Sequence, residues 1–149
     1  MILNNFILEE YDKNNVEHNN VLKKLGNDLK TQRYLGDLKM FYEFLFKNKK
    51  NGLLSNFYIA YFHYDAIGII TINEYTNSFE LAYAILPEYR RQNFGALLLK
   101  EFSLELLKRF GRINKLTLRI NSNNFGSRKV AILAGYESDL GNRYCLKRK

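Results

Sequence analysis

Apolar and polar positions along this chain follow two periods, one typical of strands and the other of helices. Short alternating or β-branched runs bounded by turns predict strands at residues 2–10, 57–62, 67–73, 79–86, 116–120, around 136, and 143–147. Apolar residues three and four positions apart predict helices over residues 14–25, 31–46, 94–110 and 124–133. The Asn51-Gly52 pair marks a turn between the second helix and the next strand. Hairpins come first and strand–helix–strand units follow, which predicts a mixed α+β (mixed α/β) fold.

The chain has the size and composition of one globular domain. Its 149 residues are 46% hydrophobic and 26% charged with a single proline, so we expect one domain over residues 1–149. The longest apolar run, residues 66–72, is far shorter than the ~20 residues of a membrane span. The first residues lack the basic region and the cleavage site of a signal peptide. With Cys145 as its one cysteine, we expect a cytoplasmic protein without a disulfide framework or a metal site.

The net charge of +8 is carried by the second half of the chain. Residues 1–75 contain nine basic and nine acidic side chains, whereas residues 76–149 contain fourteen basic and six acidic ones. Such asymmetry indicates a partner rich in phosphate, either a nucleic acid or a phosphorylated cofactor. A basic surface that only keeps the protein soluble is the alternative.

The segment between the predicted strand 79–86 and the long helix after it has the features of an anion site. It runs from Leu86 to Ala96 and passes directly into the helix. A helix N-terminus offers unpaired backbone N–H groups and the positive end of the helix dipole, which suits a diphosphate. Gly95 would let a phosphate approach the backbone closely. The side chains that could add charge or donors are Arg90, Arg91, Gln92 and Asn93. A solvated basic loop before a helix is the alternative.

A second segment, residues 124–136, begins a helix directly after a strand. Asn124 and Ser127 have the spacing of an N-cap and the residue that it caps, so capping alone would explain them. Asn124 is also expected beside the loop at residues 86–96. There its amide could bind an extended molecule lying between two strands.

Together the two segments resemble the GNAT superfamily of acyl-CoA N-acyltransferases. The run from Leu86 to Ala96 is similar to its pyrophosphate-binding motif, and Asn124-x-x-Ser127 followed by Gly135-Tyr136 is similar to its next motif. The pattern is most similar to the branch that acetylates the N-termini of ribosomal proteins, with its antibiotic-modifying relatives. The resemblance covers the chain from about residue 30 to the end. It implies a GNAT-type fold, a mostly antiparallel twisted sheet of about six to seven strands flanked by about four helices.

Two positions depart from the superfamily pattern. The loop of the superfamily reads Arg-x-x-Gly-x-Gly, and Asn93 stands here at the first glycine. Asn is among the non-glycine residues that best tolerate a positive φ, so we expect the loop to keep its shape. Many members also carry a tyrosine, the general acid for the leaving thiolate, where this chain has Ala131.

The resemblance implies an acetyl-CoA-dependent N-acetyltransferase that needs no metal. A primary amine attacks the thioester directly in a ternary complex, without a covalent enzyme intermediate. The backbone N–H near Leu86 is the candidate donor to the developing oxyanion. The implied cofactor-binding residues are Ile85, Leu86, Arg90, Arg91, Gln92, Asn93, Phe94, Gly95, Ala96, Asn124 and Ser127.

Glu80 is the candidate general base, since the nucleophilic ammonium must lose a proton. On an extended strand it shares a face with two alanines, whose small side chains leave room beside it. Glu43 and Glu74 are weaker alternatives. Ser127 is the candidate to assist the leaving thiolate, with Tyr136 as an alternative that is also typical of a core aromatic.

The amine that accepts the acetyl group is left open. A protein N-terminus, a polyamine, an aminoglycoside and an amino acid all fit. The resemblance implies that the first two helices line the acceptor pocket, and these carry Tyr34, Phe41, Tyr42, Glu43 and Phe46. An enzyme that acetylates aminoacyl-tRNA would use the basic second half and bind with a steep salt dependence. A non-catalytic acyl-CoA- or RNA-binding module is the alternative from another class. The oligomeric state is left open, and the resemblance makes a homodimer one candidate assembly.

Overall fold

The computed structural model describes residues 1–49 and 55–148, and the turn expected at Asn51-Gly52 lies outside them. The described residues form one seven-stranded sheet in the order β1-β2-β3-β4-β5-β7-β6. The strands are β1 (Phe6–Glu10), β2 (Phe57–Phe62), β3 (Asp65–Glu74), β4 (Ser78–Ile85), β5 (Lys115–Arg119), β6 (Glu137–Ser138) and β7 (Arg143–Lys147). Of these neighbours β4 and β5 pair in parallel and the others pair antiparallel. β1 begins at Phe6, four residues after the predicted start of the first strand at Ile2.

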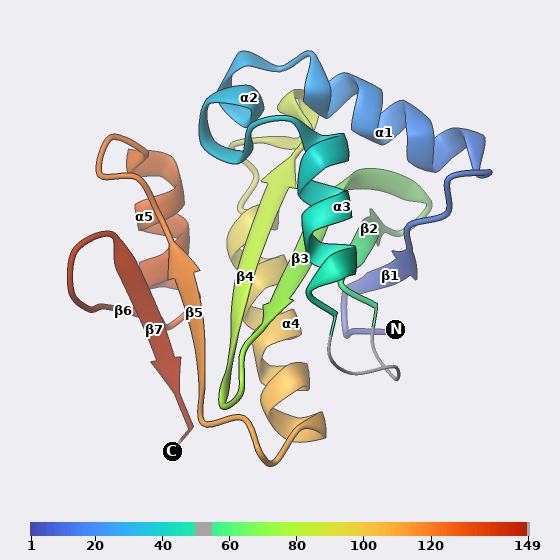
Figure 1. The fold of residues 1–149 in the computed structure, drawn as a ribbon. Coiled ribbons are helices and arrows are strands. Elements are labelled where there is room, and N and C mark those ends of the chain that lie inside the picture. Colours follow the sequence, from blue (N-terminus) through green and yellow to red (C-terminus); the bar gives the residue numbers. More distant parts are fainter. Residues whose placement is uncertain (50–54, 149) are drawn as a thin grey trace.

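Helices cover both faces of the sheet (Figure 1). One face carries α1 (Val16–Gly26), α2 (Leu29–Leu35) and α3 (Leu38–Lys47), and the other carries α4 (Phe94–Arg109) and α5 (Phe125–Leu133). An apolar cluster lies on each face, one including Phe79 and Phe102 and the other including Leu25 and Ile59. This arrangement confirms the predicted mixed α+β class and the mostly antiparallel sheet. None of the described helices is long and apolar enough to cross a membrane.

The region predicted as one helix over residues 31–46 is two helices, so that prediction was wrong. Apolar residues continue at helical spacing through the break, and this concealed it. Gly36 ends α2 with a φ of 71°, and Asp37 caps α3 by accepting a hydrogen bond from the Met40 N–H at 3.0 Å. Asp28 caps α2 in the same way. The break lets α2 lie over the C-terminal end of β4 (Figure 1).

β4 and β5 separate part-way along their length, and this separation opens the site. Their parallel ladder runs from the pair Ser78–Lys115 to the pair Leu81–Leu118. β4 continues to Ile85, where it is still paired with β3 on its other edge. Beyond Leu81 the edge of β4 that faced β5 therefore borders a gap rather than a strand.

Candidate active site

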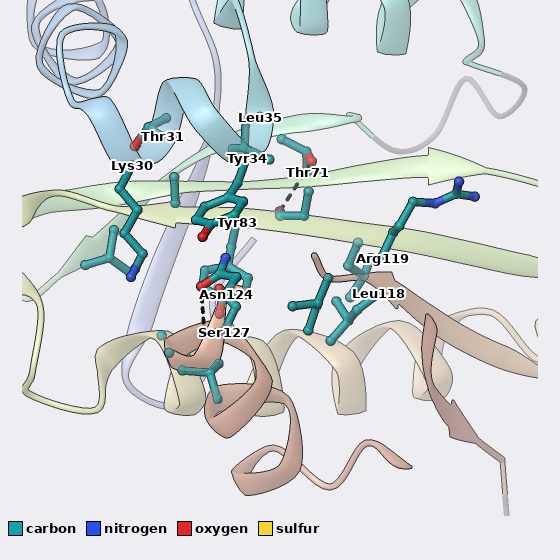
Figure 2. Close-up of a pocket in the computed structure, with 18 of the residues that line it drawn as sticks. Lys30, Thr31, Tyr34, Leu35, Thr71, Tyr83, Leu118, Arg119, Asn124 and Ser127 are labelled. Carbon is teal, nitrogen blue, oxygen red and sulfur yellow. Dashed lines mark hydrogen bonds between the residues drawn. The ribbon is translucent and has the colours of Figure 1, made fainter. Parts of the chain in front are cut away.

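A cavity of about 1010 Å³ opens where β4 and β5 separate. Its walls come from α2, α3, the end of β4, and the first turns of α4 and α5 (Figure 2). Nine of the predicted catalytic and cofactor-binding residues line it, although they come from distant parts of the chain. These residues are Glu80, Ile85, Arg90, Arg91, Asn93, Phe94, Gly95, Asn124 and Ser127.

Backbone donors of β4 face the gap in an alternating pattern. The Leu86 N–H donates to the carbonyl oxygen of Ile67 at 2.8 Å, so it is directed at β3 and cannot serve as the expected oxyanion donor. Backbone groups alternate in direction along an antiparallel ladder. The N–H groups of Tyr83 and Ile85 therefore face the gap, and the donor prediction near Leu86 is corrected to these two.

The side chains of three predicted cofactor-binding residues do not line the cavity. Leu86 is buried in the core on the other face of the sheet. Gln92 is exposed, and its side chain donates to the carbonyl oxygen of Glu88 at 3.4 Å. Ala96 is buried within α4 and can offer a ligand only its backbone N–H. These three residues are close to the loop in the sequence. The chain turns between neighbouring residues, however, so their side chains do not reach the cavity.

The first turn of α4 carries amides that no helical carbonyl accepts. Asn93 precedes the helix with a φ of 63°, which confirms that this position needs the left-handed conformation that the missing glycine would favour. Its side chain makes no capping hydrogen bond, and the first amide to bond within the helix is that of Leu97, to the Asn93 carbonyl oxygen. Arg91 is also left-handed, with a φ of 66°, which the sequence did not indicate. These two turns direct the start of α4 at the gap.

Gly95 packs directly against the end of β4. A Cβ atom here would lie 3.4 Å from Cε2 of Tyr83, 3.7 Å from Ile85 and 3.7 Å from Val130. The absence of a side chain therefore keeps the space between α4 and β4 open at the point where the free amides converge.

Arg90 is committed to the protein itself. Its Nε donates to the Ile85 carbonyl oxygen at 2.9 Å, and its guanidinium pairs with the carboxylate of Asp28 at 2.6 Å. The Arg90 hydrogen bond is the largest cause that holds the pKa of Asp28 at about 2, below its usual range. Arg90 thus ties α2 to the loop before α4, and exposed Arg91 is left as the loop's available cation.

Tyr83 is a site residue that sequence reasoning missed. Its hydroxyl is buried at the gap and makes no hydrogen bond of ordinary geometry with a described residue. Burial raises the pKa of Tyr83 to about 12, and the nearby Ser127 side chain lowers it slightly. A buried hydroxyl of this kind is normally satisfied by a partner. By strand alternation, Tyr83 lies on the face of β4 opposite to Glu80. A ligand can reach the Tyr83 face because β4 separates from β5, which the sequence does not reveal.

Asn124 and Ser127 do form the predicted helix cap. The Asn124 Oδ1 accepts a hydrogen bond from the Ser127 N–H at 3.2 Å (Figure 2). Asn124 is also buried and lines the cavity, as the second interpretation of this motif required. Because the cap uses Oδ1, the Nδ2 group is what remains for a bound molecule. The capping and binding interpretations are therefore compatible.

Glu80 lies on the cavity face that looks toward α2 and α3. Its side chain is 23% exposed, and its carboxylate lies 3.3 Å from Nε of Arg119, whose side chain is 74% exposed. The alternative bases Glu43 and Glu74 do not line the cavity. Tyr136 is a core residue whose hydroxyl lies 2.7 Å from that of Ser103.

The helices α2 and α3 supply the remaining wall. Tyr34 and Phe41 line the cavity as predicted, and Phe44 joins them, whereas the predicted residues Tyr42, Glu43 and Phe46 do not. Figure 2 shows Lys30 and Tyr34 pointing from α2 toward the start of α5. The Lys30 Nζ lies 3.3 Å from the position that a Cβ on Gly126 would occupy, so this side chain crosses the gap.

The family assignment follows from a match over most of the chain. The model of the Acetyltransferase (GNAT) family matches residues 22–136. The chain belongs to this family. This confirms the resemblance that the two motifs indicated. It also confirms the predicted class of enzyme, an acetyltransferase.

Solved structures share the GNAT fold of this chain at low sequence identity. A GNAT-family acetyltransferase from Bacillus anthracis is 12% identical with a TM-score of 0.74, covering 99% of this chain and 97% of its own. An acetyltransferase from Salmonella typhimurium that modifies the N-terminal serine of a 50S ribosomal subunit protein is 14% identical with a TM-score of 0.74, covering 98% and 96%. The aminoglycoside acetyltransferase AAC(6')-Ib, solved with coenzyme A and kanamycin, is 15% identical with a TM-score of 0.71, covering 97% and 94%. No curated protein matches the chain in sequence.

Proposed function

We propose that this GNAT protein transfers the acetyl group of acetyl-CoA to a primary amine by direct attack in a ternary complex. The observation that carries the proposal is the gap between β4 and β5, bordered by unpaired backbone amides and ending at the free first turn of α4. An extended acyl-pantetheine chain with a diphosphate at one end needs these two features together. Coenzyme A bound to a structural neighbour supports the same assignment.

The residues present fit that cosubstrate. Free amides at the start of α4 and the exposed guanidinium of Arg91 would hold the diphosphate. The N–H groups of Tyr83 and Ile85, with Nδ2 of Asn124, would bind along the pantetheine chain. We call the residues 83–96 and 124–127 the cofactor wall.

On the other side of the cavity, Glu80 would receive the proton of the attacking amine. Acetyl-CoA supplies an activated acyl group, whose C–S bond breaks as the C–N bond forms. The N–H of Tyr83 or Ile85 would donate to the carbonyl oxygen as its negative charge grows. The Ser127 hydroxyl, with the Tyr83 hydroxyl near it, would supply a proton to the departing sulfur. Because a thiol has a pKa of about 8.5, this last proton can also come from water.

Residues from α2, α3, β4 and β5 would surround the acceptor, and we call them the acceptor wall: Tyr34, Phe41, Phe44, Glu80 and Arg119. A protein N-terminus and a small-molecule amine are both candidate acceptors, since one solved neighbour modifies the first and another is an aminoglycoside acetyltransferase. The cytoplasmic location stays a prediction, and a homodimer and activity on aminoacyl-tRNA stay open alternatives. In the described part of the chain, no group of three or more His, Cys, Asp or Glu side chains could hold a metal ion.

Thermal unfolding with acetyl-CoA, and with ATP as a polyanion control, tests the cofactor assignment. At a hundredfold excess over Kd, acetyl-CoA should add about 2.7 kcal/mol to the free energy of unfolding. This corresponds to several degrees in Tm for a domain of this size. Equal shifts with both compounds, fading in salt, would contradict a specific site. Release of the CoA thiol in the presence of a panel of amines then tests turnover, and binding without any turnover would favour the non-catalytic module.

A pair of arginine variants locates the binding. Arg91→Ala should weaken acetyl-CoA binding by about 1–3 kcal/mol, because it removes a charged hydrogen-bond donor. Arg109→Ala is the matched control, since Arg109 lies at the other end of α4 and pairs with Glu105. If both variants bind acetyl-CoA like the parent, the diphosphate is held by the backbone alone.

A further inference from the structure

The second half of the sheet carries four basic side chains on one face. Lys115 and Arg119 lie on β5, where alternate residues share a face. Directly opposite them on β7 lie Lys147 and Arg143, in the pairs Lys115–Lys147 and Arg119–Arg143. We call these four residues the basic strip. The leucines of β5 point the other way, into the apolar cluster with α4 and α5.

No helix covers this face of β5 and β7, because α1, α2 and α3 lie over the earlier strands (Figure 1). Arg119, Arg143 and Lys147 are exposed, and Lys115 is half-buried. Among the described residues, no carboxylate forms an ion pair with Lys115, Arg143 or Lys147, and Glu80 contacts Arg119 at 3.3 Å. The face is open and strongly positive.

The placement of these charges opposes folding. Like charges directly opposite each other on neighbouring strands destabilise a sheet. Other basic residues of the second half serve the fold: Arg148 donates to the carbonyl oxygens of Phe110 and Ile113, and Arg128 donates to the Tyr144 hydroxyl. Within the described residues, three of the four cations of the strip have no carboxylate partner, and the fourth, Arg119, contacts the candidate base Glu80, which favours a role in binding.

The basic strip leads into the active-site cavity. Arg119 both ends the strip and lines the cavity, and Glu80 is paired in register with Thr117 between the two charged pairs. The strip therefore begins at Arg119 in the cavity wall, passes the candidate base, and extends about 13 Å along β5, the length of four residues. A chain whose amine reaches Glu80 would place its following residues over these cations.

We propose that the acceptor is the N-terminus of an acidic polypeptide segment, whose carboxylates bind the basic strip while its amine enters the cavity. This inference rests on the proposed N-acetyltransferase activity and names its substrate class. Arg is well suited to carboxylates because its planar fork binds both oxygens. A polycationic aminoglycoside suits this side of the cavity less well, since its one lining carboxylate among the described residues, Glu80, already contacts Arg119. The α2 residues that line the cavity add two further cations, Lys30 and Arg33.

A peptide suits the strip better than single-stranded RNA. Recognition of unpaired bases relies on aromatic side chains on which the bases stack. The described residues of β5 and β7 that share the face of the strip are Thr117 and Cys145, and neither is aromatic. Carboxylates on an extended chain need only the cations.

Three peptides test the proposal, each with the same first two residues and a short tail of glutamate, glutamine or lysine. Acetylation is measured by thiol release at low and physiological salt, and peptide binding to the CoA-loaded protein by fluorescence anisotropy. The double variant R143E/K147E should raise KM for the glutamate-tailed peptide about tenfold and leave kcat unchanged. The glutamine-tailed peptide should be unaffected, and the lysine-tailed peptide should improve. The control K100E/K108E makes the same change of charge on exposed positions of α4.

Each outcome separates the inference from the activity on which it rests. R143E/K147E should fold at least as well as the parent, because each new glutamate faces a cation across the ladder. Equal kcat/KM for the three tails would overturn the acidic acceptor while leaving the acetyltransferase intact. Preference for kanamycin, or for an aminoacyl-tRNA, would also overturn it. Binding of the glutamate tail with no turnover of any amine would instead count against the proposed activity and support the strip.

Discussion

The two walls of the cavity are held in different ways. The cofactor wall is fixed by backbone conformation and by one internal ion pair: Asn93 and Arg91 take left-handed conformations, Gly95 packs on β4, and Arg90 bonds to Asp28 and Ile85. The acceptor wall is made of side chains, and Glu80 is held there by one 3.3 Å contact to an arginine that is 74% exposed.

We expect the backbone contacts of the cofactor wall to suit any member of the family, and the side chains of the acceptor wall to differ with the acceptor. Backbone amides bind a diphosphate and an extended chain in the same way whatever the neighbouring side chains are. Side chains that line an open cavity can vary more freely than the backbone that holds them. Two of the solved neighbours share the fold while one modifies a ribosomal protein and the other is bound to kanamycin. Changes in the cofactor wall should therefore affect folding or cofactor binding, and changes in the acceptor wall should affect turnover.

The largest expected effect tests the rigidity of the cofactor wall. Gly68 of β3 faces Ile85, and a Cβ at Gly68 would lie 2.1 Å from the carbonyl oxygen of Ala84. Gly68→Ala should therefore lower the free energy of unfolding by about 3 kcal/mol through overpacking. This is about 10 °C in Tm by thermal unfolding. Gly111→Ala is the control, because no atom lies within 4 Å of its Cβ position. Similar Tm values for both variants would show that this backbone can shift.

The next effect concerns turnover through the acceptor wall. Glu80→Gln should lower kcat about 100-fold, since an amide cannot accept the proton of the attacking ammonium. The Tm shift with acetyl-CoA should stay unchanged, because Glu80 lies away from the cofactor wall. Glu105→Gln is a matched control whose carboxylate pairs with Arg109 on α4. An unchanged kcat for Glu80→Gln would remove it as the general base.

Much of the fold followed from the sequence because strand and helix periods are local properties. The loop from Arg90 to Gly95 was also recognisable, since a left-handed residue and an absent side chain leave a signal in residue type. The division of the predicted helix at Gly36 was missed because apolar spacing continued across it. Local pattern therefore predicted the elements better than their interruptions.

The parts of the site that escaped prediction depend on contacts between distant segments. Arg90 was expected at the cofactor, but its partner Asp28 comes from α2, 62 positions earlier. Tyr83 became a site residue because β5 leaves β4 after Leu81. The direction of the Leu86 N–H depends on the register with β3. No residue type by itself records such pairings.

A pH series probes the tie between α2 and the cofactor wall. The pKa of Asp28 is about 2 in the folded protein, below its ordinary value of 3.8. The ion pair therefore stabilises the fold fully above pH 3.8, and this stabilisation is lost as the pH falls toward 2. Asp28→Asn should cost about 1–2 kcal/mol near neutral pH and much less near pH 2, measured by urea unfolding. Asp37→Asn, which changes a cap with no arginine ion pair among the described residues, serves as the control. A constant difference across this range would mean that the pair adds no pH-dependent stability.

The smallest effect distinguishes conformation from contact within the cofactor wall. Asn93 and Arg91 have nearly the same φ, 63° and 66°, but only the arginine offers a charge to the diphosphate. Glycine should relieve backbone strain at either position, by at most about 1 kcal/mol. Asn93→Gly should therefore bind acetyl-CoA as well as the parent or slightly better. Arg91→Gly should gain similar stability and yet bind more weakly. Calorimetric titration with acetyl-CoA measures the affinity of both variants. A clear loss of affinity in Asn93→Gly would mean that the asparagine side chain itself contacts the ligand.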